Sequence, residues 1–492
     1  MPASPDGATS KVWVRAAAAV WIGIAAFLAV RLSGLAQDDF FITYRYAWNL
    51  AAGNGFVFNA GERVFGLTDP GIGLLLAALH FVTRLPIPAL GSVVTGAALA
   101  GIALLVLLEG RERGRTTEAV IGGTLVVSSS YLWLNQGAGV FLAVLLLLLA
   151  ARLADRSLWV SGLLAGAAVW MRPDAVVGVG LLGLLLWIER RRLPWAYAFA
   201  GTAVIAAGAL AAWAYFGSVV PNTLAAKNAM AAVIPAGSES WAGGRFWARS
   251  FPILPRHWGA QWRWIVTLGL LGHGVLLAKG GRTIRLLALF SLALAVAYPL
   301  LDVPFFTWYI VPSAIAALYG LAFLAGAAGR MSGRRTAAVA VGLLLLLPVF
   351  VSLVPASWRW CRNHNWQRHL RTYREAALWI RGHSAPADEI AYVEIGVLAF
   401  YSERTVVDLM GLVTPEAIPY VEVGDLVGAF LARPARFVVF HSRGRMLPLL
   451  NRRWFQSAYE QVARFEEGED RELTVYRRLP GSRIRPPRKP KK

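Results

Sequence analysis

The sequence has a single cysteine, Cys361, in 492 residues. An internal disulfide is therefore excluded, and Cys361 has no CxxC partner with which to hold a structural metal ion. The seven histidines show neither HxxxH nor HExxH spacing, so a zinc site is not expected. A Walker phosphate-binding loop is missing as well, which leaves ATP binding without support.

Charged residues are scarce: they make up 16% of the chain, and hydrophobic residues make up 57%. In soluble domains about a quarter of the residues are charged and about a half are apolar. The hydrophobic residues form long blocks, which are typical of membrane-spanning helices. Windows of about 19 residues predict eleven spans, at 16–35, 89–108, 117–134, 138–153, 158–171, 175–188, 195–216, 263–278, 284–300, 308–326 and 336–354. We therefore expect an all-α polytopic membrane protein with about eleven transmembrane helices.

Acidic residues are outnumbered by basic ones, 28 to 49, and the net charge is +21. Such a balance often indicates nucleic-acid binding, but here Lys and Arg mostly separate the apolar blocks, so we expect no nucleic-acid partner. Basic residues follow every second predicted span, while the opposite turns at 135–137 and 301–307 have none. Because basic loops stay in the cytoplasm, the N-terminus is predicted inside and everything after residue 354 outside. A large outer part without disulfides favours a bacterial cytoplasmic membrane.

The predicted transmembrane domain, 1–354, contains one apolar stretch at 70–83 that is too short to cross a bilayer. We interpret it as a helix in the interface, so that 36–88 is one long outer loop. Residues 355–480 change to short β-like runs, EIAYVEI, TVVDLM, RFVVF and ELTVY, and predict a small extracytoplasmic α/β domain. The basic, Pro-rich end at 481–492 is predicted to be disordered.

Two adjacent acids, Asp38 and Asp39, begin the outer loop directly after the first predicted span. Acids at a membrane surface are costly to desolvate and often functional. One interpretation is a general base, a ligand for a divalent cation (Mg²⁺ or Mn²⁺), or both, because adjacent carboxylates raise each other's pKa. The other is a helix N-terminus, where acids favour the helix dipole. Glu394 and Glu403, in the C-terminal part, are interpreted as a solvated face.

From Asp38 to Val64 the loop reads DDFFITYRYAWNLAAGNGFVFNAGERV. This pattern resembles the first extracytoplasmic loop of the membrane arabinofuranosyltransferases of the GT-C superfamily. Weaker matches to that family follow in order along the chain. They are Arg172-Pro173-Asp174, Tyr215-Phe216-Gly217 with Pro221-Asn222-Thr223 and Lys227, Trp308-Tyr309 with Pro312, and Asp408 with Gly411, Leu412 and Pro415.

The resemblance implies a GT-C-like fold and an enzyme that takes a sugar from a polyprenyl-phosphate donor. The motif favours arabinofuranose, with a hexose next, and the acceptor would be an envelope glycan, glycolipid or protein outside the membrane. The catalytic base would be Asp38 or Asp39, with Asp38 preferred. Cations for the donor phosphate would be Arg172, Lys227 and Arg45. Candidates for substrate contacts are Asn49, Asn59, Glu62, Arg63, Asp69, Asp174, Asn222, Trp308 and Tyr309.

Simpler interpretations stay open for several of these residues. Arg172 is also explained as a side chain that reaches from a helix end to the interface, and Lys227 as a solvated charge. Trp308 and Tyr309 fit the aromatic belt of any membrane interface. Arg45 fits a surface ion pair with the two acids.

The sequence departs from the family at two acidic positions. Phe65 stands where a glutamate is common, and 136–140 reads QGAGV in place of an SGLET turn, so that Gly139 brings no carboxylate. Asp69 is a candidate to replace one of these acids. Two other classes of protein stay open: a transporter or flippase for a lipid-linked glycan, and a catalytically silent scaffold. Polar residues gather at the outer ends of the predicted spans, which disfavours transport.

Overall fold

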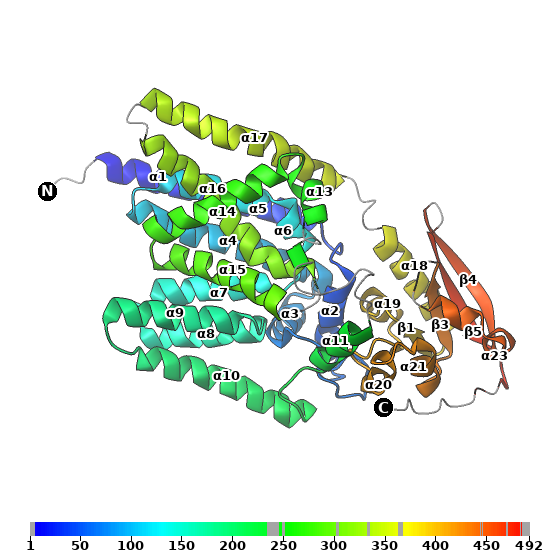
Figure 1. Ribbon diagram of the computed structural model, residues 1–492. Helices are drawn as coiled ribbons and strands as arrows, with labels where there is room; N and C mark the ends of the chain where they lie inside the picture. The colour runs from blue at the N-terminus through cyan, green and yellow to red at the C-terminus, as the bar shows by residue number, and fades with distance from the viewer. Residues whose placement is uncertain are drawn as a thin grey trace. The chain divides into compact units, whose positions relative to one another are not determined.

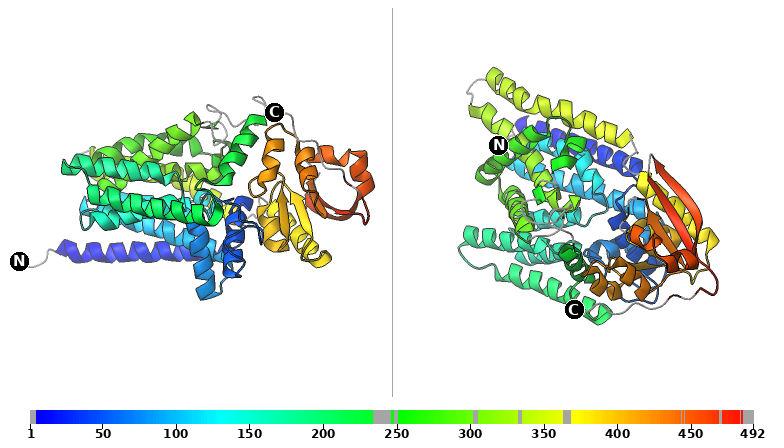
Figure 2. Two further views of the ribbon diagram at one scale, coloured as in Figure 1. Left: turned by 90° about the horizontal axis from the view of Figure 1, so that it is seen from below. Right: turned by 45° about the vertical axis from the view of Figure 1, so that its right-hand side comes forward.

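The computed structural model describes residues 5–233, 246–247, 251–301, 305–331, 335–362, 368–442, 444, 446–468, 471–482 and 484. Contacts divide the chain into two compact units, and each combines three separate stretches of sequence (Figures 1 and 2). The helical unit comprises 1–36, 88–208 and 242–363. The sheet unit comprises 37–87, 209–241 and 364–492.

The helical unit consists of helices (Figure 1). They are α1 (Pro5–Arg31), α4 (Ile87–Glu112), α5 (Thr116–Ser128), α6 (Ser130–Leu134), α7 (Val140–Leu153), α8 (Leu158–Met171), α9 (Ala175–Arg190), α10 (Trp195–Phe216), η1 (Phe251–Ile253), α13 (Leu254–Trp258), α14 (Trp262–Lys279), α15 (Arg282–Leu300), η2 (Thr307–Ile310), α16 (Val311–Met331) and α17 (Arg335–Arg362). The chain leaves this unit twice for the sheet unit, between α1 and α4 and between α10 and η1. The last turns of α10 belong to the sheet unit.

Each predicted span falls on helical structure, because the long apolar blocks favour helices there. The range 117–134 is divided, since Ser129 is extended between α5 and α6. Six described helices are long and apolar enough to cross a membrane: Val14–Arg31, Ile87–Glu112, Trp195–Phe216, Arg282–Leu300, Thr307–Met331 and Val339–Arg362. These helices indicate a multi-pass membrane protein, while the number of eleven spans and their direction stay predictions.

Helices α14 and α16 approach each other closely, because small residues meet at their contact. A Cβ on Gly272 would overlap the backbone of Gly320, and a Cβ on Gly320 would lie 2.6 Å from the carbonyl oxygen of Gly269. Small residues are what allows helix backbones to pack this tightly in a membrane. Substituting either glycine with a larger residue would therefore separate the two helices.

A buried acid links α4 to α15 in the helical unit. The carboxylate of Glu109 accepts hydrogen bonds from the backbone N–H groups of Thr283 (2.9 Å) and Ile284 (3.1 Å) in the first turn of α15. It thereby satisfies two donors that a helix N-terminus leaves open. Arg282 beside them pairs with Asp155 at 3.0 Å. These charges lie in loops and helix ends that the sequence predicts to be cytoplasmic.

The sheet unit contains the outer loop, a short helix after α10 and the C-terminal part. Its elements are α2 (Asp38–Ala51), α3 (Pro70–Thr83), α11 (Asn222–Val233), α18 (Arg368–His383), β1 (Glu389–Tyr392), α19 (Gly396–Ser402), β2 (Thr405–Asp408), η4 (Pro415–Ala417), α20 (Ile418–Val421), α21 (Leu426–Ala432), β3 (Phe437–His441), α22 (Leu447–Leu450), α23 (Arg453–Ala458), β4 (Tyr459–Gly468) and β5 (Arg471–Arg478). The helix predicted at 70–83 is confirmed as α3.

The five strands form one mixed sheet in the order β2-β1-β3-β5-β4. Strand β1 is parallel to β2 and to β3, whereas β5 is antiparallel to β3 and to β4. The four predicted runs correspond to β1, β2, β3 and β5, which confirms a small C-terminal sheet. The carboxyl ends of β1 and β2 lie at the same edge of the sheet, as in other parallel sheets with ligand sites.

Candidate active site

The acid pair begins helix α2, and Asp38 connects it to the C-terminal part of the sheet unit. One carboxylate oxygen of Asp38 accepts the backbone N–H of Gly396 at 3.0 Å, and the other accepts that of Val397 at 2.7 Å. Both N–H groups belong to the first turn of α19, whose dipole favours a negative charge. Burial raises the pKa of Asp38 to about 8, and the negative charges of Glu394 and Asp39 add to the rise. The two N–H groups oppose it.

Asp39 lies in a different environment from its neighbour. Its side chain is half-buried, and it forms no hydrogen bond with any residue that the structure describes. Burial raises its pKa; the positive charge of Lys227 on α11 opposes the rise and the negative charge of Glu394 adds to it. Asp39 therefore has carboxylate oxygens available to a ligand, between one positive and one negative charge.

Glu394 follows β1 by two residues and reaches the acid pair from the C-terminal part. Tyr373 on α18 hydrogen-bonds to Glu394, and the hydroxyl of Tyr392 donates to that of Tyr373 at 3.2 Å. Glu394 is exposed, which agrees with the solvated face that the sequence indicated, and its charge also raises the pKa of both Asp38 and Asp39. Its position at the carboxyl end of a buried strand was the signal that could have identified it.

Two predicted ligand-binding residues on α2 hold the following loop in place. The Nε of Arg45 donates to the carbonyl of Phe58 at 3.2 Å. The amide nitrogen of Asn49 donates to the carbonyls of Val57 and Phe58, at 2.9 and 2.8 Å. Both side chains are buried, so they satisfy backbone groups that would otherwise lose their hydrogen bonds.

Asn59 and Glu62 connect the outer loop to the C-terminal sheet. The side chain of Asn59 accepts the backbone N–H of Val406 and donates to its carbonyl, each at 3.0 Å, on the open edge of β2. It also donates to Glu62 at 2.9 Å. The other oxygen of Glu62 pairs with Arg433 at 2.6 Å, and Arg433 pairs with Glu389. These contacts hold the outer loop directly against β2 and Arg433, which follows α21, and through Arg433 against the start of β1.

Asn222 begins α11 and fastens it to the turn after β2. Its amide nitrogen donates to the carbonyls of Gly411 and Leu412, at 2.7 and 2.9 Å. The turn needs the positive φ of Gly411 (84°), which glycine adopts readily. The buried carboxylate of Asp408 stabilises the turn by accepting the backbone N–H groups of Met410 and Val413. This turn is one of the segments that resemble the family.

A cavity of about 510 Å³ lies beside α11, and we refer to it as the α11 cavity. Its lining comes from the outer loop, from the end of α10 through α11, and from η4: Arg63, Val64, Phe65, Phe216, Ser218, Val220, Pro221, Asn222, Leu224, Ala225, Asn228 and Pro415. The guanidinium of Arg63 lies over the ring of Tyr215, 5.0 Å from its centre. No described carboxylate is close enough to Arg63 to form an ion pair.

Four predicted site residues lie in the helical unit. Nε of Arg172 donates to Asp174 at 2.9 Å, and the hydroxyl of Tyr298 donates to the same carboxylate oxygen. Arg172 also lies over the ring of Tyr309, 5.2 Å from its centre, and Trp308 is buried next to it in sequence. The second oxygen of Asp174 is buried and has no partner among the described residues. Tyr298 is a member of this group that the sequence did not single out.

The donor set does not fit a dedicated metal centre in the part of the chain that the structure describes. No group of three or more His, Cys, Asp and Glu side chains is placed there to hold an ion. Both oxygens of Asp38 already accept backbone N–H groups. A role for Mg²⁺ or Mn²⁺ at Asp38 or Asp39 stays a prediction.

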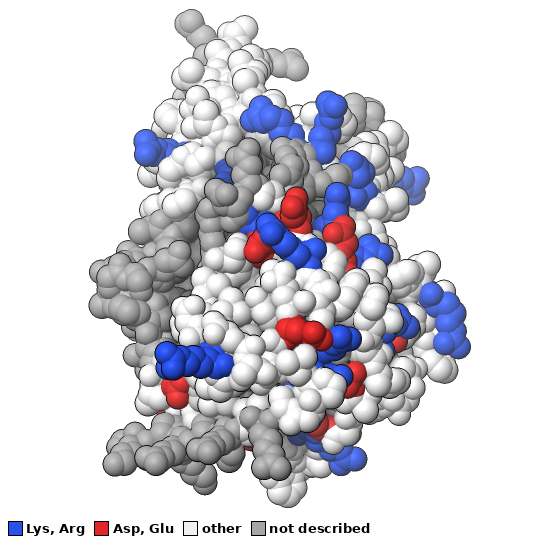
Figure 3. All heavy atoms as spheres, turned by 90° about the vertical axis from the view of Figure 1, so that its right-hand side faces the viewer, with Lys and Arg blue, Asp and Glu red and all other residues white. Residues whose placement is uncertain are grey.

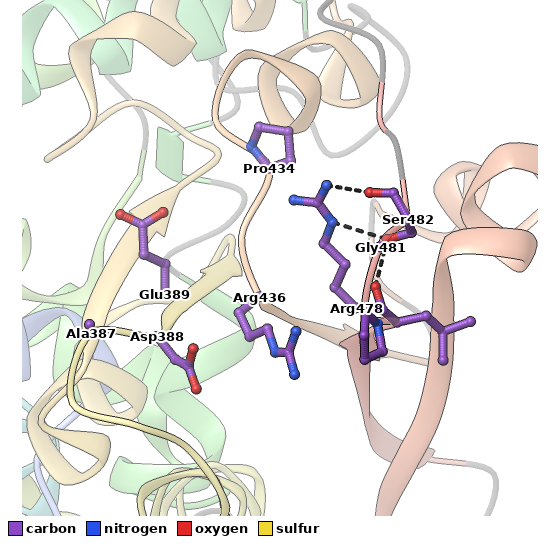
Figure 4. Close-up of a pocket in the computed structure, with 10 residues that line it drawn as sticks. Ala387, Asp388, Glu389, Pro434, Arg436, Arg478, Gly481 and Ser482 are labelled. Carbon is purple, nitrogen blue, oxygen red and sulfur yellow. Dashed lines mark hydrogen bonds between the residues drawn. The ribbon is translucent and has the colours of Figure 1, made fainter.

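A second polar hollow of about 380 Å³ lies at the opposite edge of the sheet, where β1 and β3 begin and β5 ends (Figure 4). Asp388, Arg436 and Arg478 line it, and Arg478 donates to the carbonyl of Ser482 at 2.7 Å. On the molecular face shown in Figure 3, basic and acidic side chains are interspersed. The lining of the hollow carries both charges, with Asp388 and Glu389 negative and Arg436 and Arg478 positive. The length of the strands separates the hollow from the acid pair.

Known proteins resemble this chain in sequence and in fold. Residues 361–476 match a family described as a domain of unknown function, DUF8728. A terminal β-(1→2)-arabinofuranosyltransferase of Mycobacterium tuberculosis is 30% identical over 241 residues, which cover 44% of this chain and 37% of that relative. The match thus spans little more than a third of the relative's length.

Solved structures extend the comparison to the whole chain. ArnT from Cupriavidus metallidurans, bound to undecaprenyl phosphate, superposes with a TM-score of 0.56 at 12% identity over 94% of this chain and 98% of that one. AglB, an oligosaccharyltransferase of Archaeoglobus fulgidus in complex with an inhibitory peptide and a dolichol-phosphate, gives 0.52 at 13% identity over 93% and 74%. The chain has the GT-C fold. The resemblance to arabinofuranosyltransferases that the outer loop indicated is confirmed.

The positions at which the sequence departs from the arabinofuranosyltransferases, Phe65 and Gly139, fit into this fold. Phe65 stacks on Phe216 with ring centres 4.8 Å apart and forms an apolar wall of the α11 cavity. Gly139 caps α7. Asp69, the predicted substitute for a lost acid, is buried and accepts the hydroxyl of Thr43 at 2.7 Å. The structure thus places an apolar wall where the family has an acid, and it directs Asp69 into the fold.

Proposed function

We propose that this protein is a GT-C glycosyltransferase of a bacterial cytoplasmic membrane. It moves a sugar, arabinofuranose first and another pentose or a hexose next, from a polyprenyl-phosphate donor to an envelope glycan, glycolipid or protein on the outer side. The observation that carries the proposal is Asp39, a half-buried carboxylate without a hydrogen bond to any described residue. It lies in the loop that resembles the arabinofuranosyltransferases, on a GT-C fold.

Asp39 is the better candidate for the catalytic base. The sequence favoured Asp38, but both oxygens of Asp38 accept backbone N–H groups from the start of α19. A base must reach the acceptor hydroxyl at about 2.6–3.2 Å, which requires an accessible oxygen. The raised pKa of Asp39 also suits proton abstraction near neutral pH. Asp38 then positions the start of α2 and does not react.

The proposed reaction needs a base for the acceptor and positive charge for the donor phosphate. Asp39 takes the proton of an acceptor hydroxyl as the hydroxyl oxygen attacks the anomeric carbon of the donor sugar. The bond from that carbon to the phosphate oxygen breaks on the opposite face, and its electron pair leaves with the phosphate, so the configuration inverts. We assign to Lys227, whose charge acts on Asp39, the role of stabilising the negative charge on the leaving phosphate.

Arg172 is proposed as a second cation for the donor phosphate. Asp174 and the ring of Tyr309 fix the direction of its guanidinium. A fixed guanidinium recognises phosphate oxygens in a defined geometry. The second oxygen of Asp174 is buried and has no described partner, so it leaves one acceptor of this group unsatisfied.

The test is a transfer assay with the purified full-length protein in lipid nanodiscs and a decaprenyl-phosphate arabinofuranose donor. Asp39→Asn is expected to lower kcat about 10²–10⁴-fold, the usual contribution of a general base. The matched control is Glu403→Gln, because Glu403 is an acid of the same unit that pairs with Arg381 at 2.8 Å on the surface. The control is expected to keep parental activity.

Full activity of Asp39→Asn would remove the catalytic assignment. Transfer from a hexose donor only would keep the reaction and correct the sugar. Movement of a lipid-linked glycan across vesicles without any covalent product would replace the proposal with the transporter alternative.

A further inference from the structure

The α11 cavity offers polar groups that the protein leaves unused. The guanidinium of Arg63 is exposed and has no described ion-pair partner. The amide of Asn228 is exposed at the other side of the lining. A guanidinium and an amide can donate to and accept from the hydroxyl groups of a sugar. The volume of about 510 Å³ lies in the range of cavities that hold small ligands.

The rim of the same cavity is apolar and exposed. Val220 and Leu224 line the cavity and are 50% and 54% exposed, and Val219, next to Val220 in sequence, is 52% exposed, although all three are aliphatic. They follow Phe216, the last residue of a helix that is long and apolar enough to cross a membrane. Exposed aliphatic side chains next to a span end favour contact with a hydrocarbon chain over contact with water.

Helix α11 connects the cavity with the electrostatic surroundings of the proposed base. Asn222 lines it, and Lys227 follows five residues later on α11, which is about 7.5 Å along a helix axis. The charge of Lys227 acts on Asp39. Leu224 and Asn228 are four residues apart and share the cavity face of α11, whereas Lys227 lies on another flank. Helix α11 therefore carries both the lining of the cavity and the residue whose charge acts on Asp39.

We propose that the α11 cavity is the acceptor subsite and that the acceptor is a glycan anchored on a lipid. The inference rests on the proposed function and specifies its second substrate. Arg63 and Asn228 hold the sugar part, the stacked pair Phe65 and Phe216 forms the wall, and Val220 and Leu224 contact the lipid part. Phe65 contributes because it replaces an acid that would have made this wall polar.

The test compares two acceptors that differ only in their lipid. The same arabinofuranose trisaccharide is supplied with a hexadecyl or with a methyl aglycone, and KM is measured for each with the full-length protein in nanodiscs. The parent is expected to have a KM at least about tenfold lower for the hexadecyl acceptor. Leu224→Asn and Val220→Asn are each expected to reduce this ratio several-fold, because both side chains are replaced by a polar group at the rim.

Two matched controls are available in the sheet unit. Val423 is 55% exposed and does not line the cavity, so Val423→Asn is expected to keep the KM ratio of the parent. Arg84 lies over the ring of Phe81 at 5.2 Å, as Arg63 lies over Tyr215. Arg63→Gln is expected to raise the KM of both acceptors about tenfold, and Arg84→Gln of neither.

The outcomes separate this inference from the reaction itself. Equal KM values of the parent for both acceptors, with normal product formation, would overturn the lipid-anchored acceptor and leave the transferase standing. An unchanged ratio in Leu224→Asn and Val220→Asn would overturn the placement in this cavity. Absence of transfer to either acceptor would overturn the proposed function and this inference with it.

Discussion

Replacement of Asn59 by alanine tests whether this residue shapes the site or binds a substrate. Its side chain is 1% exposed and forms two hydrogen bonds with Val406 on the open edge of β2. In Asn59→Ala the N–H and the carbonyl of Val406 lose their partners while they stay buried. Each unsatisfied buried group costs about 1–3 kcal/mol, so the variant is expected to lose about 2–6 kcal/mol of stability.

The measurement is thermal unfolding of the purified protein in detergent, followed by the fluorescence of the sheet unit's tryptophans. Asn54→Ala is the matched control, because Asn54 is an exposed residue of the same loop with one amide contact, to Asn49 at 3.2 Å. It is expected to lose less than about 0.5 kcal/mol. A parental melting temperature for Asn59→Ala, together with a raised donor or acceptor KM, would refute the structural role and restore the predicted substrate contact.

Three further outcomes follow from the site. Glu394→Gln is expected to move the rising limb of the profile of kcat/KM against pH to lower pH by about one unit. The substitution removes a negative charge that raises the pKa of Asp38 and Asp39, so the carboxylate of the base forms at lower pH. An unmoved limb would contradict the influence of Glu394 on the base. Arg172→Lys keeps the charge but loses the planar pairing with Asp174, and a donor KM raised about tenfold is expected in the transfer assay; a parental KM would deny it a role in donor binding. Treatment with EDTA is expected to leave the transfer rate unchanged, since the described acids form no three-ligand group; loss of activity that Mg²⁺ or Mn²⁺ restores would contradict this.

Hydropathy was sufficient to predict much of the fold, because helix formation by an apolar block depends on residues that are close together in the sequence. Long apolar blocks such as 195–216 fold as helices wherever water is excluded, so their ranges could be read from the sequence. Strands β1, β2 and β3 were also predicted, since both of their faces are buried and their runs are continuously apolar. Strand β4 was missed because its sequence, YEQVARFEEG, is mostly polar and lies at the edge of the sheet.

The site was less accessible to sequence reasoning, because its contacts join distant segments. The acid pair itself was found from its place after the first predicted span. The partners of Asp38, at Gly396 and Val397, lie 358 and 359 residues away. No local pattern connects a carboxylate to backbone N–H groups at that separation. The choice between Asp38 and Asp39 therefore could not be made before the fold was known.

The hydrogen bonds of the candidate residues divide them into residues that stabilise the fold and residues that can bind a ligand. The amides of Asn49, Asn59 and Asn222 are used by backbone carbonyls of the same unit, because a buried amide without partners is costly. Asp39 is half-buried and Arg63 is exposed, and neither side chain forms a described hydrogen bond or ion pair of its own. All five residues belong to the motifs that resemble the arabinofuranosyltransferases. Their contacts, however, show that the three amides hold the fold, whereas Asp39 and Arg63 can bind a ligand. Substitutions of the three amides should therefore lower stability first, and substitutions of Asp39 or Arg63 should change kinetic constants in a protein that melts at the parental temperature.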